Sequence, residues 1–549
     1  MTQEQAIESK RLRTLVLATS VGTAFEAYDF ILFGAMAPVI ARQFFAGVNE
    51  TAAFIIAMLV FAAGYLVRPL GALVFGSLGD RKGRKTAFLI TITLMGLSTS
   101  GIGLLPTYQM AGIWAPLLLI ALRLLQGLAF GGEYGGAVTY TAEHAPVGKR
   151  CFYVSWIQAA AGFAVFLSFF MVYVTRTAVG EERFIAWGWR IPFLISSVLL
   201  VVSVWIRLNL EESPLFKRMV AEGKSAKRPL LEAFGEWKNL KLVLLALTGL
   251  MMLQGVVFYT SHFYSFYFVT QILKLPAATM TLIMMCVTFI SVWLYIGFGW
   301  LSDRIGRKPL ALTGAVLVLA LLLPIFHGFT AGVNPSLALA EETVPVVVTA
   351  DTQQCSLQFD PVGRANFASS CDIAKGTLTL MGIGYSNVQG SPGTTALVTV
   401  GGKSMASVDG TQLSSAELAK ARETFKVSLS ALLGEAGYPL KVDTSAVNLW
   451  KLGALMMLLI LLSTLIYTMT PTIAVELLPT RIRYSALSLP YHIGSGWFGG
   501  FLNAIAFAMV AASGDIYFGL YYPLVIIAIS VVVLAVWIPE TRTRALWDQ

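Results

Sequence analysis

Charged residues are scarce in this chain, at 13% of its 549 residues, about half the ~25% typical of soluble domains. Hydrophobic residues reach 56%, and the mean hydropathy is +0.72. Apolar runs of about 20 residues, long enough to cross ~30 Å of hydrocarbon as a helix, recur along the chain. They lack the alternation of barrel strands. The scarcity of charge therefore excludes a soluble protein and predicts an all-α protein that spans the lipid bilayer many times.

Motifs of the common enzyme classes are absent as well. The sequence has no His-Glu-x-x-His zinc motif, no Gly-x-Ser-x-Gly nucleophile elbow and no Gly-rich phosphate loop. We therefore expect no enzymatic activity, no cofactor and no metal site.

Basic residues are unevenly placed, although the net charge is +9. They concentrate in alternate short connections between the apolar runs, at 10–13, 81–85, 149–150, 217–241, 304–308, 481–483 and 542–544. All of these connections would lie on one side of the membrane, which is the positive-inside bias. We therefore expect both termini in the cytoplasm, no cleavable signal peptide and no nucleic-acid partner.

Cysteine is rare, with four residues in the chain. Cys151 and Cys286 fall in or beside apolar runs and are expected to be free thiols. Cys355 and Cys371 lie together in the one large polar segment on the non-cytoplasmic side, where the compartment favours disulfides. We predict a disulfide between these two residues.

Twelve spans follow from the length of the apolar runs and the turn signals between them. They are 14–41, 53–77, 86–105, 113–141, 151–176, 190–209, 242–271, 279–301, 309–330, 449–475, 484–512 and 518–538. The predicted domains are an N-terminal six-helix half (1–210), a cytoplasmic linker (211–241), helices 7–9 of a C-terminal half (242–330), an inserted domain (331–448) and helices 10–12 (449–549).

Two short motifs occur twice and locate the insertion. Gly-x-x-x-Asp-Arg-x-Gly-Arg-Lys begins at Gly76 and again at Gly299, 223 residues later. Glu-x-x-Pro-x-x-x-Arg begins at Glu143 and again at Glu476, 333 residues later. The difference of 110 residues must have entered the second half between these landmarks. The segment 331–448 is the one non-apolar stretch long enough to hold it.

The inserted segment faces outward by the helix count, and its composition predicts a small α+β periplasmic domain. The runs 343–349 and 395–400 are typical of strands. Ser414 and Glu417 form a capping box that opens a helix through about Leu433. Capture of substrate, a lid and passive decoration remain open as roles for this domain.

Twelve helices in two halves, with the first duplicated motif after spans 2 and 8, resemble the major facilitator superfamily. Further motifs, at 25–30, 68–71, 123–136 and 476–484, are similar to those of its metabolite:proton symporter family. The resemblance implies import of a metabolite with protons, the family's substrates being α-ketoglutarate, shikimate, citrate, proline/betaine and haloacids. Ala27 departs from the pattern, because the family usually has Trp there, and this change would reshape the cavity near Glu26.

Five charged residues fall well inside the predicted spans, namely Glu26, Asp29, Arg68, Arg123 and Glu133. A charge near the bilayer centre costs at least ~2.5–3.5 kcal/mol on insertion scales, so such residues are expected to pair or to function. All five lie in the first half. This asymmetry predicts proton chemistry in the first half and polar, aromatic recognition in the second.

Helical spacing groups these charges. Glu26 and Asp29 share one face of span 1, and Arg123, Gln126 and Glu133 share one face of span 4. We expect both faces to line an aqueous central cavity. Proton coupling is assigned to Asp29 first and to Glu133 second, with Glu26 as a third candidate whose alternative role is structural.

Substrate recognition is expected from the two buried Arg residues and from polar and aromatic residues of both halves. A nearby Arg lowers the proton affinity of a carboxyl group, so a substrate anion that captures the Arg would couple substrate to proton. The predicted substrate-binding residues are Tyr28, Arg68, Arg123, Gln126, Gln158, Gln254, Tyr259, His262, Tyr491, His492 and Asn503. The alternatives are helix-holding ion pairs for the Arg residues, packing for the aromatic residues and a neutral, hydrogen-bonded His262.

The duplicated motifs are expected to act as gates. Their acids can pair with nearby Arg residues, and breaking such pairs would bias inward-open against outward-open states. The predicted gating residues are Asp80, Arg81, Arg84, Glu143, Arg150, Asp303, Arg304, Arg307, Glu476 and Arg483. Asp303 has two candidate partners, Arg304 and Arg307. Simple anchoring by positive-inside charge is the alternative.

The leading hypothesis is a monomeric, proton-coupled importer of a small organic anion in a bacterial inner membrane. The large insertion between spans 9 and 10 is similar to that of haloacid permeases, which favours a short monocarboxylate such as a haloacetate. Symport of a dicarboxylate, shikimate or proline/betaine is the first alternative. Drug antiport is disfavoured because span 5 lacks the Gly-Pro antiporter motif. A transporter-like receptor that senses ligands through the inserted domain is the alternative of another class.

Overall fold

A computed structural model describes residues 3–46, 50–82, 84–131, 134–146, 148–208, 234–351, 353, 355–356, 367–439, 443, 445–479 and 483–544. At some helical positions within these ranges, 76–82 and 84–88 among them, the backbone alone is described.

The bundle is built from two groups of helices. The N-terminal helices are α1 (Gln3–Phe44), α2 (Glu50–Leu66), α3 (Arg68–Lys82), α4 (Arg84–Leu104), α5 (Tyr108–Ala111), α6 (Trp114–Phe130), α7 (Tyr134–His144), α8 (Arg150–Val179), α9 (Glu181–Arg183), η1 (Phe184–Gly188) and α10 (Arg190–Leu208). The C-terminal helices are α13 (Trp237–Ala246), η2 (Leu247–Met251), α14 (Met252–Tyr259), η3 (Thr260–Tyr264), α15 (Ser265–Tyr267), η4 (Phe268–Ile272), α16 (Ala277–Ile305), α17 (Arg307–Val333), α21 (Leu449–Leu477), α22 (Arg483–Tyr491), η6 (His492–Gly499), α23 (Leu502–Ser513), η7 (Phe518–Leu520) and α24 (Tyr521–Val536).

Ten helical stretches in the described part of the chain are long and apolar enough to cross a membrane. An eleventh is possible if Glu181–Gly188 and Arg190–Trp205, which meet at 60°, form one bent span. The predicted span at 86–105 corresponds to a shorter apolar helix, Leu89–Leu104. Every predicted span therefore has a helical counterpart, and the membrane-spanning class is confirmed, whereas the count of twelve crossings stays a prediction.

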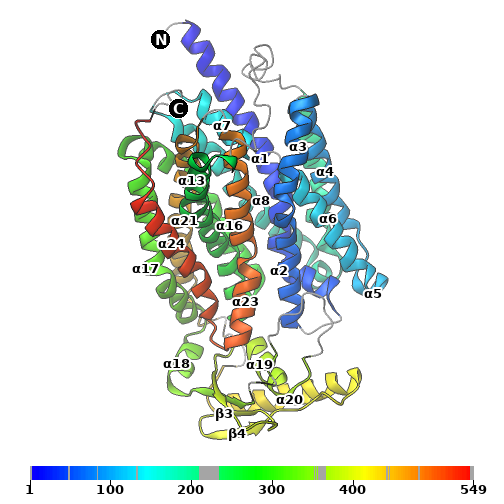
Figure 1. Cartoon of the computed structure of the whole chain (residues 1–549). Helices are drawn as coiled ribbons and strands as arrows, with labels where there is room; N and C mark the ends of the chain where they lie inside the picture. The colour runs from blue at the N-terminus through cyan, green and yellow to red at the C-terminus, as the bar shows by residue number, and fades with distance from the viewer. Residues whose placement is uncertain are drawn as a thin grey trace.

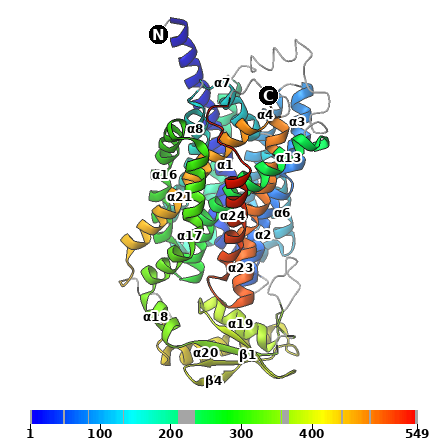
Figure 2. The same ribbon diagram turned by 60° about the vertical axis from the view of Figure 1, so that its left-hand side comes forward.

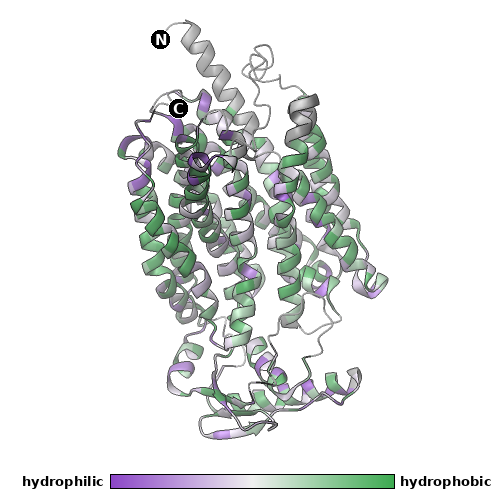
Figure 3. Cartoon of the chain, in the orientation of Figure 1, coloured by the Kyte–Doolittle hydropathy of each residue, from purple (hydrophilic) through white to green (hydrophobic). Residues whose placement is uncertain are grey.

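Hydrophobic residues predominate along the helices of the bundle (Figure 3), and large apolar side chains are exposed on it. Leu97, Val198 and Trp293 are each at least 60% exposed, although they lie within apolar helices and away from the helix ends. A soluble protein rarely exposes such a surface, because water disfavours it. Hydrocarbon chains would cover this belt at no such cost.

The two groups of helices stand side by side, and their long helices cross the bundle from end to end (Figures 1 and 2). Contact between the groups runs along α8 with α16 and along α2 with α23. The start of α1 and the end of α24 lie at one end of the bundle, and the inserted segment lies at the other (Figure 1).

Span 7 and span 11 contain turns of π-helix. Within Trp237–Ile272 the π-helical turns are η2, η3 and η4, and within Ala486–Ser513 the π-helical turn is η6. Such turns are uncommon and occur frequently at functional sites, because they turn side chains away from the regular helical face. Both spans carry predicted recognition residues, His262 in η3 and His492 in η6.

The inserted segment folds around a four-stranded sheet. Its elements are α18 (Pro335–Thr343), β1 (Val346–Ala350), α19 (Ser370–Met381), β2 (Ser386–Gln389), β3 (Leu397–Val400), β4 (Lys403–Ala406) and α20 (Ser415–Glu435). The strand order is β2-β1-β3-β4, with β1 parallel to β2 and antiparallel to β3. Val346, Val348 and Val398 are buried, and their neighbours within each strand are half-exposed, as the two-residue period of a strand requires.

Local signals predicted parts of this segment well. The two predicted strands correspond to β1 and β3, and the predicted helix corresponds to α20, whose capping box between Ser414 and Glu417 is present. The sequence did not predict α19, β2 or β4. Both β2 and β4 are edge strands with mostly exposed residues, so they lack the alternation that marks a half-buried strand.

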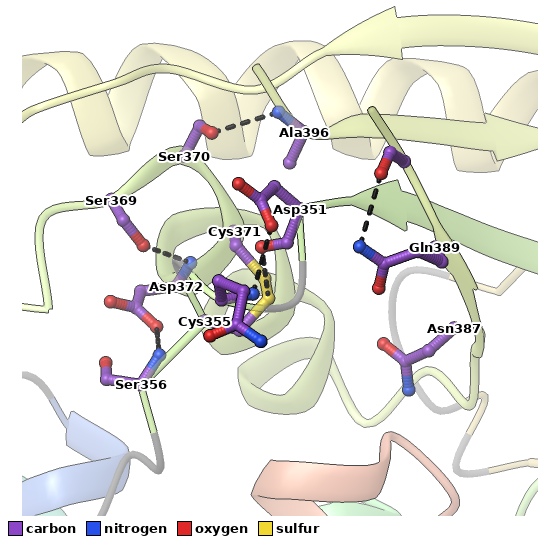
Figure 4. The surroundings of a disulfide bond; sticks show 12 residues. Asp351, Cys355, Ser356, Ser369, Ser370, Cys371, Asp372, Asn387, Gln389 and Ala396 are labelled. Atoms are coloured by element: carbon purple, nitrogen blue, oxygen red, sulfur yellow. Dashed lines mark hydrogen bonds between the residues drawn. A yellow bond between two sulfur atoms is a disulfide. The ribbon is translucent and has the colours of Figure 1, made fainter. Parts of the chain in front are cut away.

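The predicted disulfide is present between Cys355 and Cys371, whose Cα atoms lie 5.2 Å apart (Figure 4). Cys371 lies in the first turn of α19. The Ser369 side chain caps this helix by accepting a hydrogen bond from the Asp372 backbone N–H. The carboxylate of Asp372 in turn accepts a hydrogen bond from Ser356 N at 2.9 Å. The disulfide and these hydrogen bonds fasten the start of α19 to the chain that follows β1.

The inserted segment contacts the bundle through α19 and the residues after it. The helix packs against α23 and η4 of the C-terminal helices and against α2 of the N-terminal helices. Tyr385 N–H donates to the Gly514 carbonyl (3.1 Å), and Asn387 Nδ2 donates to the Ser513 carbonyl (2.7 Å). Gly382 ends α19 with φ 70°, so close to η4 that a Cβ there would lie 2.1 Å from the carbonyl oxygen of Ile272. This helix therefore touches both groups of helices.

Candidate substrate and proton site

Two guanidinium groups meet one aromatic ring inside the bundle. Arg68, the first residue of α3, lies 4.1 Å from the ring centroid of Phe30, and Arg123 of α6 lies 4.2 Å from the same centroid. The other rings that face the two cations lie at 4.0–5.3 Å, namely Tyr65 and Phe130 for Arg68 and Phe33 and Phe61 for Arg123. Both Arg residues are buried. Within the described residues, neither forms an ion pair with a carboxylate.

Close helix packing brings these groups together. A Cβ on Gly127 would lie 1.8 Å from the carbonyl oxygen of Gly64, so α6 and α2 approach each other as closely as backbones can. Arg123 Nη2 consequently reaches back to donate to the Phe61 carbonyl at 3.0 Å. Arg68 follows the one-residue break between α2 and α3 at residue 67, and it lies near Tyr467 and Tyr491 of the C-terminal helices.

Hydrogen bonds link Arg123 to further polar side chains of the N-terminal helices. Its Nη1 donates to Gln126 Oε1 at 2.6 Å, as their spacing on one face of a helix allows. Gln126 Nε2 donates to the Thr99 hydroxyl of α4 at 2.7 Å. Asp29 of α1 accepts a hydrogen bond from the Ser196 hydroxyl of α10 and lies near Thr99 of α4. Asp29 therefore lies where α1, α4 and α10 meet.

The C-terminal helices face this cluster with hydroxyl groups. The hydroxyls of Tyr65 and Tyr259 are in hydrogen-bond contact. The Arg68 guanidinium lies over the Tyr65 ring and near Tyr467 and Tyr491. His492 Nε2 donates to the Gly131 carbonyl at 2.9 Å, across the interface between the two groups of helices. Arg68, Tyr259, Tyr491 and His492 are thus predicted residues that lie on one interface.

Other predicted recognition residues have buried polar atoms. Gln254 Oε1 accepts a hydrogen bond from Thr470 at 2.8 Å, and the His262 ring stacks on Phe258 with Nδ1 against the Phe258 carbonyl. Gln254 Nε2, His262 Nε2 and both amide atoms of Asn503 have no hydrogen-bond partner among the described residues. Buried polar atoms are usually satisfied, so these atoms are candidates for contact with a ligand.

Several predicted site residues lie elsewhere or outside the described part. The Tyr28 hydroxyl donates to the Pro192 carbonyl of α10 at 2.8 Å, so it is engaged within the N-terminal helices. Gln158 and Glu26 are buried, and both have interactions with other groups. Glu133 lies outside the described residues.

Acidic and basic groups join the two groups of helices at the end that carries the chain termini. Glu476 at the end of α21 pairs with Arg307 (3.3 Å) and with Arg150 of α8 (3.6 Å). Asp303 pairs with Arg307 at 2.8 Å, and its carboxylate accepts hydrogen bonds from Cys151 N and Phe152 N at the start of α8. The contacts made by Arg150, Cys151 and Phe152 cross from the N-terminal to the C-terminal helices.

A second ion pair crosses at the same end, where Arg483 Nη1 lies 2.9 Å from Glu143 Oε1. Of the two candidate partners of Asp303, the structure selects Arg307, whereas the Arg304 guanidinium stacks on Trp300 at 3.7 Å. The side chains of Asp80, Arg81 and Arg84 lie outside the described part, so pairing in the first copy of the motif stays a prediction.

Aromatic side chains close the opposite end of the bundle. The ring of Phe54 on α2 lies 5.2 Å from that of Tyr267 and 4.8 Å from that of Phe507 on α23. The Tyr267 hydroxyl donates to the Gly34 carbonyl of α1. The two groups of helices thus touch at both ends, with the Arg68–Arg123 cluster between the two contacts.

Sequence reasoning missed several residues of these sites. Phe30, Thr99 and Ser196 are neutral residues in apolar runs, and only a contact map could have separated them from packing residues. Glu540 and Thr541 follow α24, where the Glu540 carboxylate accepts from Arg307 N and Lys308 N and the Thr541 hydroxyl donates to Glu476. A charged and a polar residue in a short tail after the last span are a signal from which these contacts could have been predicted.

No group of three His, Cys, Asp or Glu side chains that could hold a metal ion occurs in the described part. Among the described residues, the site presents two buried guanidinium groups, several hydroxyls and the carboxyl group of Asp29. Such a set can bind an anion and can bind or release a proton.

The comparisons with known proteins agree with this fold. A family model described as "Sugar (and other) transporter" matches residues 15–241 and 231–349. The chain is 36% identical to the shikimate transporter of Escherichia coli (strain K12) over 333 residues, which are 60% of this chain and 75% of that protein. It is 36% identical to the proline/betaine transporter of Salmonella typhimurium (strain LT2) over 58% of this chain and 65% of that protein, just under two thirds of its length.

Solved structures give the same fold. The crystal structure of a D-xylose-proton symporter matches with a TM-score of 0.59 at 16% identity, covering 96% of this chain and 98% of that chain. The superfamily expected from the duplicated motifs is confirmed. With a family model over more than half of its length and a relative matched over three quarters of that relative's length, the chain belongs to the sugar (and other) transporter family of the major facilitator superfamily.

Proposed function

We propose that this transporter imports a small organic anion together with a proton by alternating access. The observation that carries the proposal is the pair of buried guanidinium groups, Arg68 and Arg123, which share the ring of Phe30 and have no ion pair within the described residues. Two cations at membrane depth are costly, and they are expected to serve a ligand or a partner charge.

Aromatic rings can hold these cations without neutralising them. A cation over an aromatic face gains ~0.5–2 kcal/mol, less than the attraction of a desolvated carboxylate. Arg68 can therefore exchange its contact with the Tyr65 ring for an anionic group. Hydroxyls of Tyr259 and Tyr491 from the opposite helices supply hydrogen bonds that can orient such an anion.

A short monocarboxylate, such as a haloacetate, remains our preferred substrate. The site is walled by aromatic rings, which suits a small anion with a compact apolar body. Dicarboxylates, shikimate and proline/betaine are the alternatives, and two relatives are named for shikimate and proline/betaine transport. Proton coupling is assigned to Asp29, with Glu133 and Glu26 as further candidates.

The orientation that fits this function has both termini in the cytoplasm of a bacterium and the inserted domain in the periplasm. Basic connections at the termini's end of the bundle support this orientation. The ion pairs there and the aromatic contacts at the other end would open in turn as the two groups of helices rock. We expect a monomer to carry out the cycle.

The test is uptake into proteoliposomes with an inward proton gradient, using chloroacetate, succinate, shikimate, proline and glycine betaine in turn. We expect gradient-dependent accumulation of one of these compounds, and a loss of at least about tenfold in Arg68→Gln. Arg176→Gln is the matched control, because Arg176 pairs with Glu181 at a helix end and should be dispensable. Absence of uptake for all five compounds, with retained binding of one, would instead support the receptor alternative.

A further inference from the structure

Tyr65, the last residue but one of α2, packs against glycine residues of span 11 in the opposite group of helices. A Cβ on Gly500 would lie 2.5 Å from the Tyr65 ring, and a Cβ on Gly496 would lie 3.1 Å from it. The ring therefore fits at Gly500 because that residue has no side chain. The Trp497 indole N–H donates to the Tyr65 carbonyl at 3.3 Å. We call Gly496, Trp497 and Gly500 the glycine seat of Tyr65.

Two other glycines of span 11 hold the glycine seat in place. A Cβ on Gly494 would lie 2.6 Å from the Met251 side chain, and a Cβ on Gly499 would lie 2.8 Å from the Gly255 backbone. Both contacts are made with span 7, so spans 7 and 11 approach each other as closely as their backbones allow. The glycine seat therefore belongs to a tightly packed pair of helices.

The remaining contacts of Tyr65 belong to the substrate site. Its ring centroid lies 4.1 Å from the Arg68 guanidinium carbon and 4.6 Å from the Phe30 ring centroid. Its hydroxyl contacts the hydroxyl of Tyr259. Tyr65 is 1% exposed, so its ring fills the space between the buried cation and the glycine seat. One side chain thus touches both Arg68 and the opposite group of helices.

The glycine seat lies at one end of a longer contact. From Tyr65, α2 leads back to Phe54, whose ring meets Phe507 of α23 at the end that carries the inserted segment. Along this length α2 packs against η6 and α23. Arg68 follows Tyr65 on the side away from Phe54. The seated ring therefore stands between Arg68 and the end that carries the inserted segment.

We infer that Tyr65 is a positioning residue that closes the substrate site toward the end that carries the inserted segment, by fitting into the glycine seat. The ring holds α2 against span 11 at the depth of the buried cations. When the ring leaves the seat, α2 loses its innermost contact with span 11 and this end opens. The inference rests on the proposed function for the role of Arg68.

Distance measurements on the full chain in liposomes test this closure without any substrate. Spin labels at the exposed positions 109 on α5 and 336 on α18, with Cys151 and Cys286 replaced, report the distance across this end (Figure 1). Tyr65→Leu empties the glycine seat, and Gly500→Ala fills it with a methyl group. We expect each substitution to increase the fraction of open molecules by about tenfold, because overpacking and lost packing both disfavour the closed contact.

Three variants show whether the ring and the seat act as a unit. The double variant of Tyr65→Leu and Gly500→Ala should be no more open than the more open single variant, since both changes break one contact. Tyr65→Phe keeps the ring and should stay within about twofold of the wild type. Gly297→Ala is the matched control, because a Cβ there would meet no atom within 4 Å.

Several results would overturn the closure. These are wild-type distances in both Tyr65→Leu and Gly500→Ala, additive opening in the double variant, and equal opening in Gly297→Ala. A further one concerns labels at positions 149 and 309, at the opposite end of the bundle. Opening there as large as that between 109 and 336 would show general loosening of the bundle in place of a closure at one end.

Transport then separates closure from binding. For whichever of chloroacetate, succinate, shikimate, proline and glycine betaine is taken up, Gly500→Ala should lose gradient-driven accumulation by about tenfold. Its half-saturating concentration for binding should stay within about twofold of the wild type, because Arg68 and Arg123 are unchanged. Equal loss of both overturns the positioning role. If no compound is bound or taken up, the proposed function fails while the distances still decide the closure.

Discussion

Phe30 gives an aromatic contact to each of the two buried cations. Its ring centroid lies within 4.2 Å of both guanidinium carbons. Like charges in a low-dielectric interior repel each other more strongly than in water, and the negative face of an aromatic ring attracts a cation. A residue outside the predicted set of site residues therefore contributes to how the positive charge of the site is held.

Replacing Phe30 by Leu should weaken substrate binding more than it weakens the fold. Loss of two cation–π contacts of ~0.5–2 kcal/mol each predicts a rise of about tenfold in the concentration that gives half-maximal uptake. The measurement is uptake of the transported compound at varied concentration. Phe169→Leu is the matched control, because Phe169 is equally buried and packs on Phe266. Equal effects of the two substitutions on uptake would contradict the role of Phe30.

Among single residues, the sequence identified the charged members of the site better than the neutral residues that contact them. Arg68 and Arg123 stand out because a charge within an apolar run needs a reason, and their spacing from other polar residues is visible. Thr99 does not stand out, because its type is common in packed helices, and Phe30 stands out only as part of the motif at 25–30. Their roles arise from distances between helices that are remote in sequence, such as α1 and α4.

Helix ends carry the contacts that hold the two groups of helices together on the side of the termini. Glu143 on α7 and Arg483 at the start of α22 form an ion pair whose side chains are 10% and 1% exposed. Breaking one partner of a buried pair leaves an unpaired charge, which is more costly than losing an exposed pair. This contact therefore favours the arrangement that is closed at this end.

Arg483→Gln should increase the fraction of molecules that are open at this end by about tenfold or more. Spin labels at the exposed positions 149 and 309, with Cys151 and Cys286 replaced, would report the distance across the end. The charge swap Glu143→Arg with Arg483→Glu should restore the closed distance. A swap that opens the end further than either single substitution would contradict a direct pairing role.

The disulfide is expected to stabilise one element in particular, the start of α19. Closing a loop over a sequence separation of 16 residues is worth ~3 kcal/mol in the chain-entropy model. Replacing both Cys355 and Cys371 by Ser should increase hydrogen exchange in 370–381 while leaving α21 unchanged. Reduction of the wild-type protein should reproduce this increase. Uniform exchange in both cases would show that the disulfide does not fasten this helix.

Sequence patterns at the level of elements were informative where the pattern was local. The capping box at Ser414 predicted the start of α20, and apolar length predicted the spanning helices. The π-helical turns η2, η3, η4 and η6 were not predictable, because they depend on the helices packed around them. The edge strands β2 and β4 were missed for lack of an alternating pattern.

The joint between the inserted segment and the bundle contains a carboxyl group with an altered pKa. Burial raises the pKa of Glu341 on α18 from its ordinary value of about 4.5 to about 7. The hydrogen bond from Gly384 N–H (3.2 Å) opposes this shift, and the charge of Asp515 adds to it. Tyr438 and Tyr517 are the other titratable groups that interact with Glu341.

Docking of the inserted segment should therefore weaken as the pH rises. A carboxyl group with a raised pKa binds its proton more tightly in the docked form, so its contribution is fully present below about pH 4.5 and is lost as the pH rises through about 7. Hydrogen exchange of 383–389, corrected for intrinsic rates, should increase between pH 5 and pH 8. Glu341→Gln should abolish this dependence, and the exposed Glu423→Gln should retain it. An unaltered pH dependence in Glu341→Gln would contradict the assignment.

At the scale of the whole molecule, the two repeated motifs predicted more of the architecture than individual residues did. The unequal spacing of two duplicated motifs placed a long insertion after span 9, and a segment with its own sheet lies there, between α17 and α21. The sequence could not indicate what this segment touches. Its contacts with α2, η4 and α23 involve surfaces whose shapes result from the fold.

Contact of α19 with both groups of helices links the inserted segment to the proposed transport cycle. Tyr385 and Asn387 hold the inserted segment to the chain that follows α23, so the proposed rocking that opens this end would separate α19 from α2. The inserted segment is also the part of the molecule most accessible to large reagents, because it projects from the end of the bundle (Figure 2). An antibody fragment or a peptide that tightens or loosens this one contact could slow or speed transport without ever reaching the substrate site.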